Sequence, residues 1–204
     1  MKTTNIRNMM QTALLGAMAL FLHLWRFPLP FMPPFMDFDL SGIAEMIGAY
    51  TMGPLSGFTI IILKNLLKFM IQGTSSGGTG ELQNIMLSSV YVLTASLIFR
   101  RGGKSRKASL IGMVVGTLVC ATTAVFTNMY IIIPFFAKAF GMTMESIVAM
   151  VQKVNPYVDS TWKFIALGII PFNLIKGSVT TLVIYLTYPA LMRIASGGRT
   201  DAVQ

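Results

Sequence analysis

The chain has 204 residues, of which 54% are hydrophobic and only 11% are charged. Soluble domains carry about 25% charged residues, so this composition is typical of a membrane protein. The formal net charge is +9, and the single cysteine and single histidine exclude an intrachain disulfide and a Cys/His metal site.

The apolar runs predict an all-α integral membrane protein whose six membrane-spanning helices form a single domain over residues 1–204. A bilayer core takes about 20 apolar residues of helix. The expected spans are 6–25, 41–52, 55–71, 82–99, 108–136 and 162–192. The first resembles a signal peptide, but no small-x-small cleavage site follows it, so we expect a retained helix. The short second span and the third, joined around "GPLSG", are also open to interpretation as one bent hairpin.

The positive charge predicts the orientation of these spans. Loop 100–107, "RRGGKSRK", contains five cations and no acid, and six spans place it on the same side as both termini. With Lys2, Arg7, Arg193 and Arg199, this side holds nine of the 16 Lys and Arg residues. The positive-inside rule makes this side cytoplasmic. We therefore expect a multi-pass cell-membrane protein surrounded by lipid, with no nucleic-acid partner.

The first outer loop, residues 27–40, has the sequence "FPLPFMPPFMDFDL", with four prolines and two acids. Prolines reduce the entropy lost when a loop becomes ordered, and apolar side chains give the loop something to bury. Its aromatic residues are Phe27, Phe31, Phe35 and Phe38. We expect a lid over the helix ends, with an interfacial segment among lipid headgroups as the alternative. A further outer loop is expected at 137–161.

Two motifs in the outer loops resemble catalytic ones. "GTSSG" matches G-x-S-x-G, but that hydrolase motif needs a strand–turn–helix context and a histidine partner, and no lysine follows as in a phosphate-binding loop. Asp37 and Asp39 in "DFD" resemble acid pairs that hold a divalent cation against a diphosphate. Only Glu45 lies near them in sequence, so we interpret them as loop acids or as the mouth of a site. A metal-dependent membrane transferase using Asp37 and Asp39 remains the alternative from another functional class.

Lys64 and Lys68 lie four residues apart and share one face of the third span. Lys68 is near the outer end, where a lysine can extend its ammonium toward water. Lys64 is deeper, and we expect it to form a structural ion pair with Glu45 or Glu81.

Asn173 and Lys176 in "PFNLIKG" lie on one helix face, and Asn128 is the corresponding polar residue of the fifth span. Counted from the outer helix ends, the three reach similar depths. Ionisable residues inside a membrane are functional candidates by default. No carboxylate lies near Lys176 in its own span or the fifth, so an outward-facing pocket for a flat solute with a polar edge is favoured over an internal polar network.

Four segments in this order, "FPLPFMPPFMDFDLSGI", "GELQN", "TNMYIIIP" and "PFNLIKG", resemble the riboflavin-specific substrate-binding (S) component of energy-coupling factor (ECF) transporters. The resemblance covers nearly the whole chain. It implies a protein that is not an enzyme and uses no cofactor, because riboflavin, or FMN, is captured from outside as the substrate. The implied partners are a transmembrane coupling subunit and two ATPases. An S component for another vitamin is the nearest alternative.

The resemblance also implies the site residues. The polar contacts to the flavin correspond to Asn128, Asn173 and Lys176, and the first loop corresponds to the lid. Further substrate contacts are expected from Phe38, Asp39 and Tyr130, with apolar walls from Phe126 and Phe172. The small residues that meet the coupling subunit correspond to Ala13 and Ala17.

Overall fold

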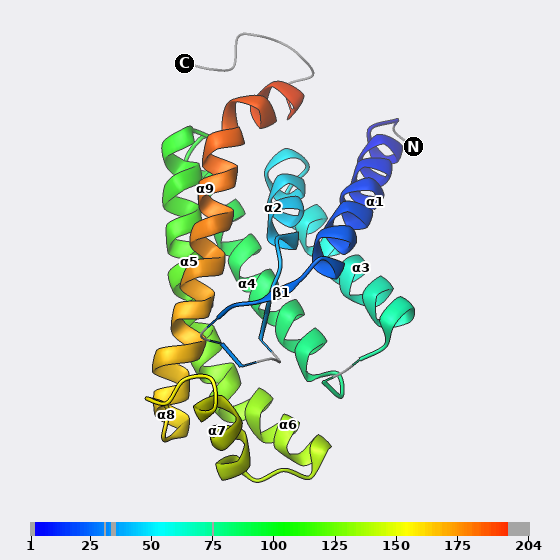
Figure 1. The fold of residues 1–204 in the computed structure, drawn as a ribbon. Coiled ribbons are helices and arrows are strands. Elements are labelled where there is room, and N and C mark those ends of the chain that lie inside the picture. Colours follow the sequence, from blue (N-terminus) through cyan, green and yellow to red (C-terminus); the bar gives the residue numbers. More distant parts are fainter. Residues whose placement is uncertain (1–2, 31, 34–35, 75, 196–204) are drawn as a thin grey trace.

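The computed structural model describes residues 3–30, 32–33, 36–74 and 76–195. Lys2, Phe31, Phe35 and Arg199, which carried part of the predictions above, lie outside the described residues. The described part is a helical bundle with a short two-stranded ribbon (Figure 1). Its elements are α1 Thr3–Leu24, β1 Phe27–Pro28, β2 Asp37–Phe38, α2 Ser41–Thr51, α3 Pro54–Gln72, α4 Thr79–Arg101, α5 Arg106–Thr127, η1 Asn128–Ile132, α6 Ile133–Phe140, α7 Met144–Gln152, α8 Thr161–Phe164, η2 Ile165–Ile169 and α9 Ile170–Ala195.

Four stretches within the described residues are long and apolar enough to cross a membrane, and each coincides with a predicted span. They are Pro54–Gln72, Thr79–Arg101, Arg106–Phe140 and Thr161–Arg193. Helix α1, with 22 residues, coincides with the predicted first span. Helix α2 has only 11 residues, or about 16 Å at 1.5 Å per residue, which is roughly half of a bilayer core. The fold is therefore that of a helical multi-pass membrane protein with one short helix packed inside.

Helix α2 joins α3 through a tight turn at Gly53, whose φ of 124° is a conformation that favours glycine. A Cβ atom at Gly53 would lie 2.4 Å from a guanidinium nitrogen of Arg100. Pro54 then starts α3 at a position where the missing N–H has no helical partner to lose. The structure has two separate helices on the two sides of "GPLSG", at the positions of the predicted second and third spans.

Helices α4 and α5 pack closely because small residues face the contact. A Cβ atom at Gly112 of α5 would lie 2.6 Å from the Ala95 carbonyl oxygen of α4. One turn later, a Cβ atom at Gly116 would lie 3.0 Å from the Tyr91 carbonyl oxygen. Glycines four residues apart allow two helix backbones to approach, which is how helices associate in lipid. This contact fixes one wall of the bundle.

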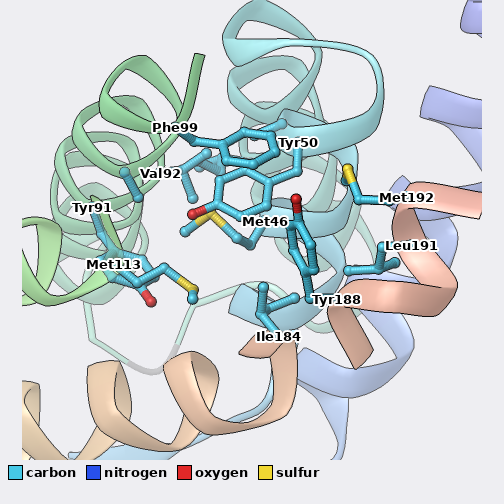
Figure 2. Packing of buried hydrophobic residues seen from close by; sticks show 13 residues of the cluster. Met46, Tyr50, Tyr91, Val92, Phe99, Met113, Ile184, Tyr188, Leu191 and Met192 are labelled. Atoms are coloured by element: carbon cyan, nitrogen blue, oxygen red, sulfur yellow. The ribbon is translucent and has the colours of Figure 1, made fainter. Parts of the chain in front are cut away.

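An aromatic cluster fills the half of the bundle toward the N- and C-terminal ends of the chain (Figures 1 and 2). Tyr50 and Phe99 stack with their ring centroids 4.1 Å apart, and Tyr188 meets Phe99 edge-on at 6.3 Å. Met46 and Met113 fill the space around the rings. Buried aromatic pairs in these geometries stabilise a core beyond their buried area. This half of the bundle therefore has a tightly packed hydrophobic core.

The predicted outer loop 137–161 instead contains the end of α6 and all of α7. Thr143 caps α7 because its hydroxyl accepts the Ser146 N–H. Ile147 and Val151, one turn apart, are buried against the bundle. The segment is therefore partly helical and packed against the bundle. Its apolar pattern is too short to distinguish a helix from a loop in the sequence.

Candidate functional site

A cavity of about 480 Å³ lies in the half of the bundle opposite the chain termini. Its walls come from α1, the first loop, α2, α3, α4, α5, η1, α6, α7, α8, η2 and α9. Pockets for small molecules usually measure about 300–1,000 Å³ and combine apolar walls with a few convergent polar groups. This cavity is the candidate site.

The apolar walls of the cavity come mostly from η1, α6, α7, η2 and α9. They are formed by Met36, Leu87, Ile132, Ile133, Phe136, Phe140, Met142, Ile147, Met150, Phe164, Ile169 and Phe172. Phe136 and Phe140 pack ring against ring, with centroids 4.6 Å apart. Flat aromatic surfaces and flexible methionines together suit a planar apolar body.

The two asparagines predicted from sequence both line this cavity, and each lies near a widened turn of its helix. At η1 the Ile133 N–H donates to the Asn128 carbonyl, and at η2 the Ile170 N–H donates to the Ile165 carbonyl. A proline follows each turn, Pro134 and Pro171. Proline lacks an N–H and clashes with the carbonyl four residues earlier, and a π-turn accommodates that misfit. Such turns often occur at functional sites.

The side-chain amides of Asn128 and Asn173 are held in the same way. Asn128 Nδ2 donates to the Ala124 carbonyl at 2.7 Å, and Asn173 Nδ2 donates to the Ile169 carbonyl at 2.8 Å. An amide group has two N–H donors and an oxygen with two lone pairs. Each buried amide is therefore oriented by its own helix and retains hydrogen-bonding capacity for a ligand in the cavity.

Lys176, the third predicted polar residue, is paired with an acid from the first loop. Its Nζ donates to Asp39 Oδ2 at 2.6 Å, and His23 Nδ1 of α1 lies 3.3 Å from the same oxygen. No acid of the lysine's own span or the fifth was available, and the partner is 137 residues away in sequence. The lysine side chain is still 21% exposed and lines the cavity.

The first loop places Asp39 through a short ribbon. Phe27 pairs with Phe38 and Pro28 with Asp37, so the loop folds back on itself before α2 begins. Buried Phe38 packs against Phe27 and meets Phe172 edge-on, with ring centroids 5.4 and 6.4 Å apart. The loop is therefore anchored over the bundle rather than loosely attached.

The charge state of Asp39 follows from its neighbours. Burial alone would raise the pKa of the Asp39 carboxyl, but the Lys176 ammonium and the hydrogen bond to His23 outweigh burial and hold this pKa well below its usual value. Asp39 is thus a carboxylate, and it compensates the charge of Lys176.

The structure confirms the predicted structural ion pair of Lys64, and it corrects the expectation for Lys68. Lys64 Nζ lies 2.5 Å from Glu45 Oε1, and both side chains are fully buried. Lys68 does not extend to water as expected, because it is buried and paired with Glu81 at the start of α4. Glu81 belongs to the next helix, α4, so the spacing of residues along α3 does not reveal this ion pair.

The structure does not bring every predicted residue to the cavity. Tyr130 is 70% exposed, and Phe126 is also exposed, so both point away from the site. Each lies two residues from Asn128, and residues two apart on a helix point to nearly opposite faces. Phe38 is buried behind Phe172, which itself lines the cavity.

Several cavity residues were missed in the sequence. His23 of α1, Cys120 of α5 and the polar residues Gln83, Asn84 and Ser88 of α4 all line the cavity. The spacing of Asn84 and Ser88 could have indicated a polar face of α4, because positions four residues apart share one helix face. His23 and Cys120 had none, because each is an isolated residue in an apolar span.

Asp37 and Asp39, the basis of the transferase alternative, are both engaged by cations. Asp37 Oδ2 lies 3.2 Å from Arg26 Nε, and Asp39 pairs with Lys176. Over the residues that the structure describes, no three His, Cys, Asp or Glu side chains gather where they could hold a metal ion.

The predicted partner residues lie away from the cavity. Ala13 and Ala17 are exposed on α1, one turn apart, while Gly16 and Ala19 between and beside them are buried. Helix α1 packs with its other face on α2 and α3. The alanines therefore lie on a surface open to the membrane.

Comparison with known proteins gives consistent matches. The family model "ECF transporter, substrate-specific component" matches residues 7–188. The riboflavin transporter RibU of Staphylococcus aureus is 28% identical over 91% of this chain and 90% of its own, and the riboflavin transporter FmnP of Bacillus subtilis is 26% identical over 90% of each. The solved structure of the S component of a bacterial ECF transporter superposes with a TM-score of 0.71, at 27% identity, over 93% of this chain and 98% of that one.

Proposed function

The chain belongs to the substrate-specific components of ECF transporters, and we propose that the substrate it captures is riboflavin. This family consists of transporter components rather than enzymes, which removes the transferase alternative. The relatives from Staphylococcus aureus and Bacillus subtilis, both named riboflavin transporters, support the choice of vitamin.

The observation that carries the proposal is the convergence of Asn128, Asn173 and Lys176 on one cavity with aromatic walls. The pyrimidine edge of the isoalloxazine ring has two carbonyl groups and an imide N–H. Two amides supply both donors and acceptors for such an edge, and an ammonium supplies donors. The apolar remainder of the ring fits between Phe136, Phe172 and their neighbours.

The polar face of α4 supports the choice of a ligand with a hydroxylated chain. Gln83, Asn84 and Ser88 line the cavity from the helix that lies across from η2 and α9. The ribityl chain of riboflavin carries several hydroxyl groups, each of which needs hydrogen-bond partners when buried. FMN, which differs by a phosphate on this chain, is the second ligand to test.

We propose that six segments cross or enter the membrane, with both termini and loop 100–107 in the cytoplasm and residues 27–40 as an outer lid. The basic composition of loop 100–107 supports the orientation. The packing of Phe38 on Phe172 supports the lid, because a loop anchored on a cavity wall can close over the cavity mouth.

Transport requires partners. We propose that the chain works with an ECF module of one coupling subunit and two ATPases, and that Ala13 and Ala17 contact the coupling subunit. Exposed small residues on a membrane helix allow another helix backbone to approach, which supports this surface.

The test is flavin binding by the purified protein. Protein from riboflavin-containing medium is expected to be yellow, and ligand-free protein is expected to quench riboflavin fluorescence with one-to-one stoichiometry. Thiamine and biotin serve as competitors for the alternative that the substrate is another vitamin. If either competes as well as riboflavin does, the proposed substrate is wrong.

A further inference from the structure

A continuous chain of hydrogen bonds joins Lys176 in the cavity wall to Lys64 in α3. Asp39 accepts from Lys176 through Oδ2 and from the Ser41 hydroxyl and N–H through Oδ1. Lys64 Nζ donates to Ser41 Oγ at 2.9 Å. We propose that Ser41 and Lys64 are positioning residues, which set the ligand-binding geometry of Lys176 through Asp39 without touching the ligand.

Three members of this chain of hydrogen bonds, Ser41, Asp39 and Lys64, are shielded from water. Ser41 is 1% exposed, Asp39 is buried, and Lys64 is fully buried. A buried polar group without a hydrogen-bond partner is strongly unfavourable, so each member is confined to the partners that it has. The positions of the groups are therefore coupled rather than independent.

The chemistry of the donors fixes the direction of every hydrogen bond. An ammonium group can only donate, so Ser41 must use its oxygen to accept from Lys64. A hydroxyl has a single hydrogen, and with its oxygen engaged by Lys64 that hydrogen is directed to Asp39. Lys64 thus orients the Ser41 hydroxyl, and the hydroxyl in turn holds one oxygen of Asp39.

With Oδ1 held by two donors of Ser41, the other oxygen of Asp39 is fixed toward Lys176 and His23. Lys64 itself is anchored by Glu45 and by Asn84 Oδ1, which lies 2.7 Å from its Nζ. The anchoring groups belong to α2, α3 and α4, so three helices contribute to the position of a lysine on α9.

The test uses Ser41→Ala, which removes the linking hydroxyl and leaves both lysine–carboxylate pairs in place. This inference rests on the proposed function, so the probe is riboflavin, with affinity read from fluorescence quenching in detergent. Because Ser41 acts on the ligand only through Asp39 and Lys176, its loss should cost less than the roughly 10- to 150-fold of losing the charged hydrogen bond itself, and we expect affinity weaker by about three- to tenfold. In a Lys176→Met background the same change is expected to have less than about a twofold effect, because the group that it positions is gone.

Matched variants separate positioning from general destabilisation. Ser96→Ala removes an equally buried serine of α4, whose hydroxyl donates to the Leu93 carbonyl, and should leave affinity unchanged. Ser41→Thr, which keeps the hydroxyl, should restore most of the affinity. If Ser41→Ala does not fold, the double variant Lys64→Met/Glu45→Gln tests the same link and should show the same dependence on Lys176. It neutralises the buried pair as a unit and keeps the length of the Glu45 side chain, which lines the cavity.

The outcomes are distinct. An effect of Ser41→Ala that depends on Lys176 supports the inference. Equal effects with and without Lys176, or unchanged affinity, would overturn it while leaving riboflavin as the ligand. Absence of quenching by the wild-type chain would overturn the proposed function and this inference with it.

Discussion

Lys64 and Lys176 are both lysines inside the helical bundle, and each lies against a carboxylate, yet their surroundings differ. Lys64 is fully buried and donates to Glu45, Ser41 and Asn84, so all three of its ammonium hydrogens have acceptors. Lys176 is partly exposed to the cavity, and among the described residues its ammonium hydrogen bonds to Asp39. A lysine whose three N–H donors all have acceptors in the protein has a structural role. A lysine with further donors can also bind a ligand.

The two pairs also differ in how they connect the chain. Lys64 and Glu45 are 19 residues apart and join neighbouring helices α3 and α2. Lys176 and Asp39 are 137 residues apart and join α9 to the first loop. The second pair therefore ties the proposed lid to the ligand site, so that the order of the loop and the state of the site are linked.

The largest expected effect is on stability, from Glu45→Ala. This change leaves the fully buried Lys64 without its counter-ion, and breaking a buried pair costs about 3–5 kcal/mol. A large drop in the thermal unfolding temperature in detergent, or loss of monodisperse protein, is expected. The control is Asp159→Ala, which breaks an exposed pair with Lys163 and should give no measurable shift. An unchanged unfolding temperature for Glu45→Ala would show that the buried pair does not hold α2 to α3.

The next effect is on affinity, from Lys176→Met. Loss of a hydrogen bond from a charged donor should weaken riboflavin binding roughly 10- to 150-fold, measured by fluorescence titration. The fold should persist with a lowered unfolding temperature, because buried Asp39 loses its counter-ion but keeps its hydrogen bonds from Ser41 and its contact with His23. Lys163→Met, at an exposed lysine, is the control. Wild-type affinity in Lys176→Met would place this lysine with Lys64, as a structural residue.

Smaller losses are expected from Asn128→Leu and Asn173→Leu, about two- to tenfold each, because a neutral hydrogen bond is weaker than a charged one. The same titration applies, and the effects need not add, because both amides would contact one ring system. Asn155→Leu, in a turn outside the cavity, is the matched control. Two variants that bind like the wild type would assign both amides to helix structure alone.

The smallest expected effect on affinity is from Ala13→Leu/Ala17→Leu, since both residues are exposed on α1 away from the cavity. Riboflavin affinity in detergent should be unchanged, while co-purification with the coupling subunit and ATP-dependent uptake should be lost. Ala149→Leu, at an exposed alanine of α7, is the control for added bulk. Wild-type uptake by the double variant would show that this face of α1 does not contact the partner.

The sequence predicted four of the spans well because each is a long apolar run, and length and hydropathy are local properties. It also brought Asn128, Asn173 and Lys176 into one site, and the structure places all three on one cavity. Tyr130 is instead exposed, because it lies two residues from Asn128 and therefore on the opposite face of the helix. The sequence missed α7, whose two buried residues, Ile147 and Val151, make too short a pattern to predict a helix.

The sequence by itself thus determined the membrane class, the candidate polar residues and the structural role of Lys64. Only the tertiary structure decided which carboxylate compensates Lys176, because Asp39 reaches it through the fold of a loop 137 residues away. Likewise, only the structure showed that Ser41 links this pair to Lys64. Hydropathy follows from the residues one by one, whereas a buried charge is compensated by whichever group the folded chain brings within about 3 Å.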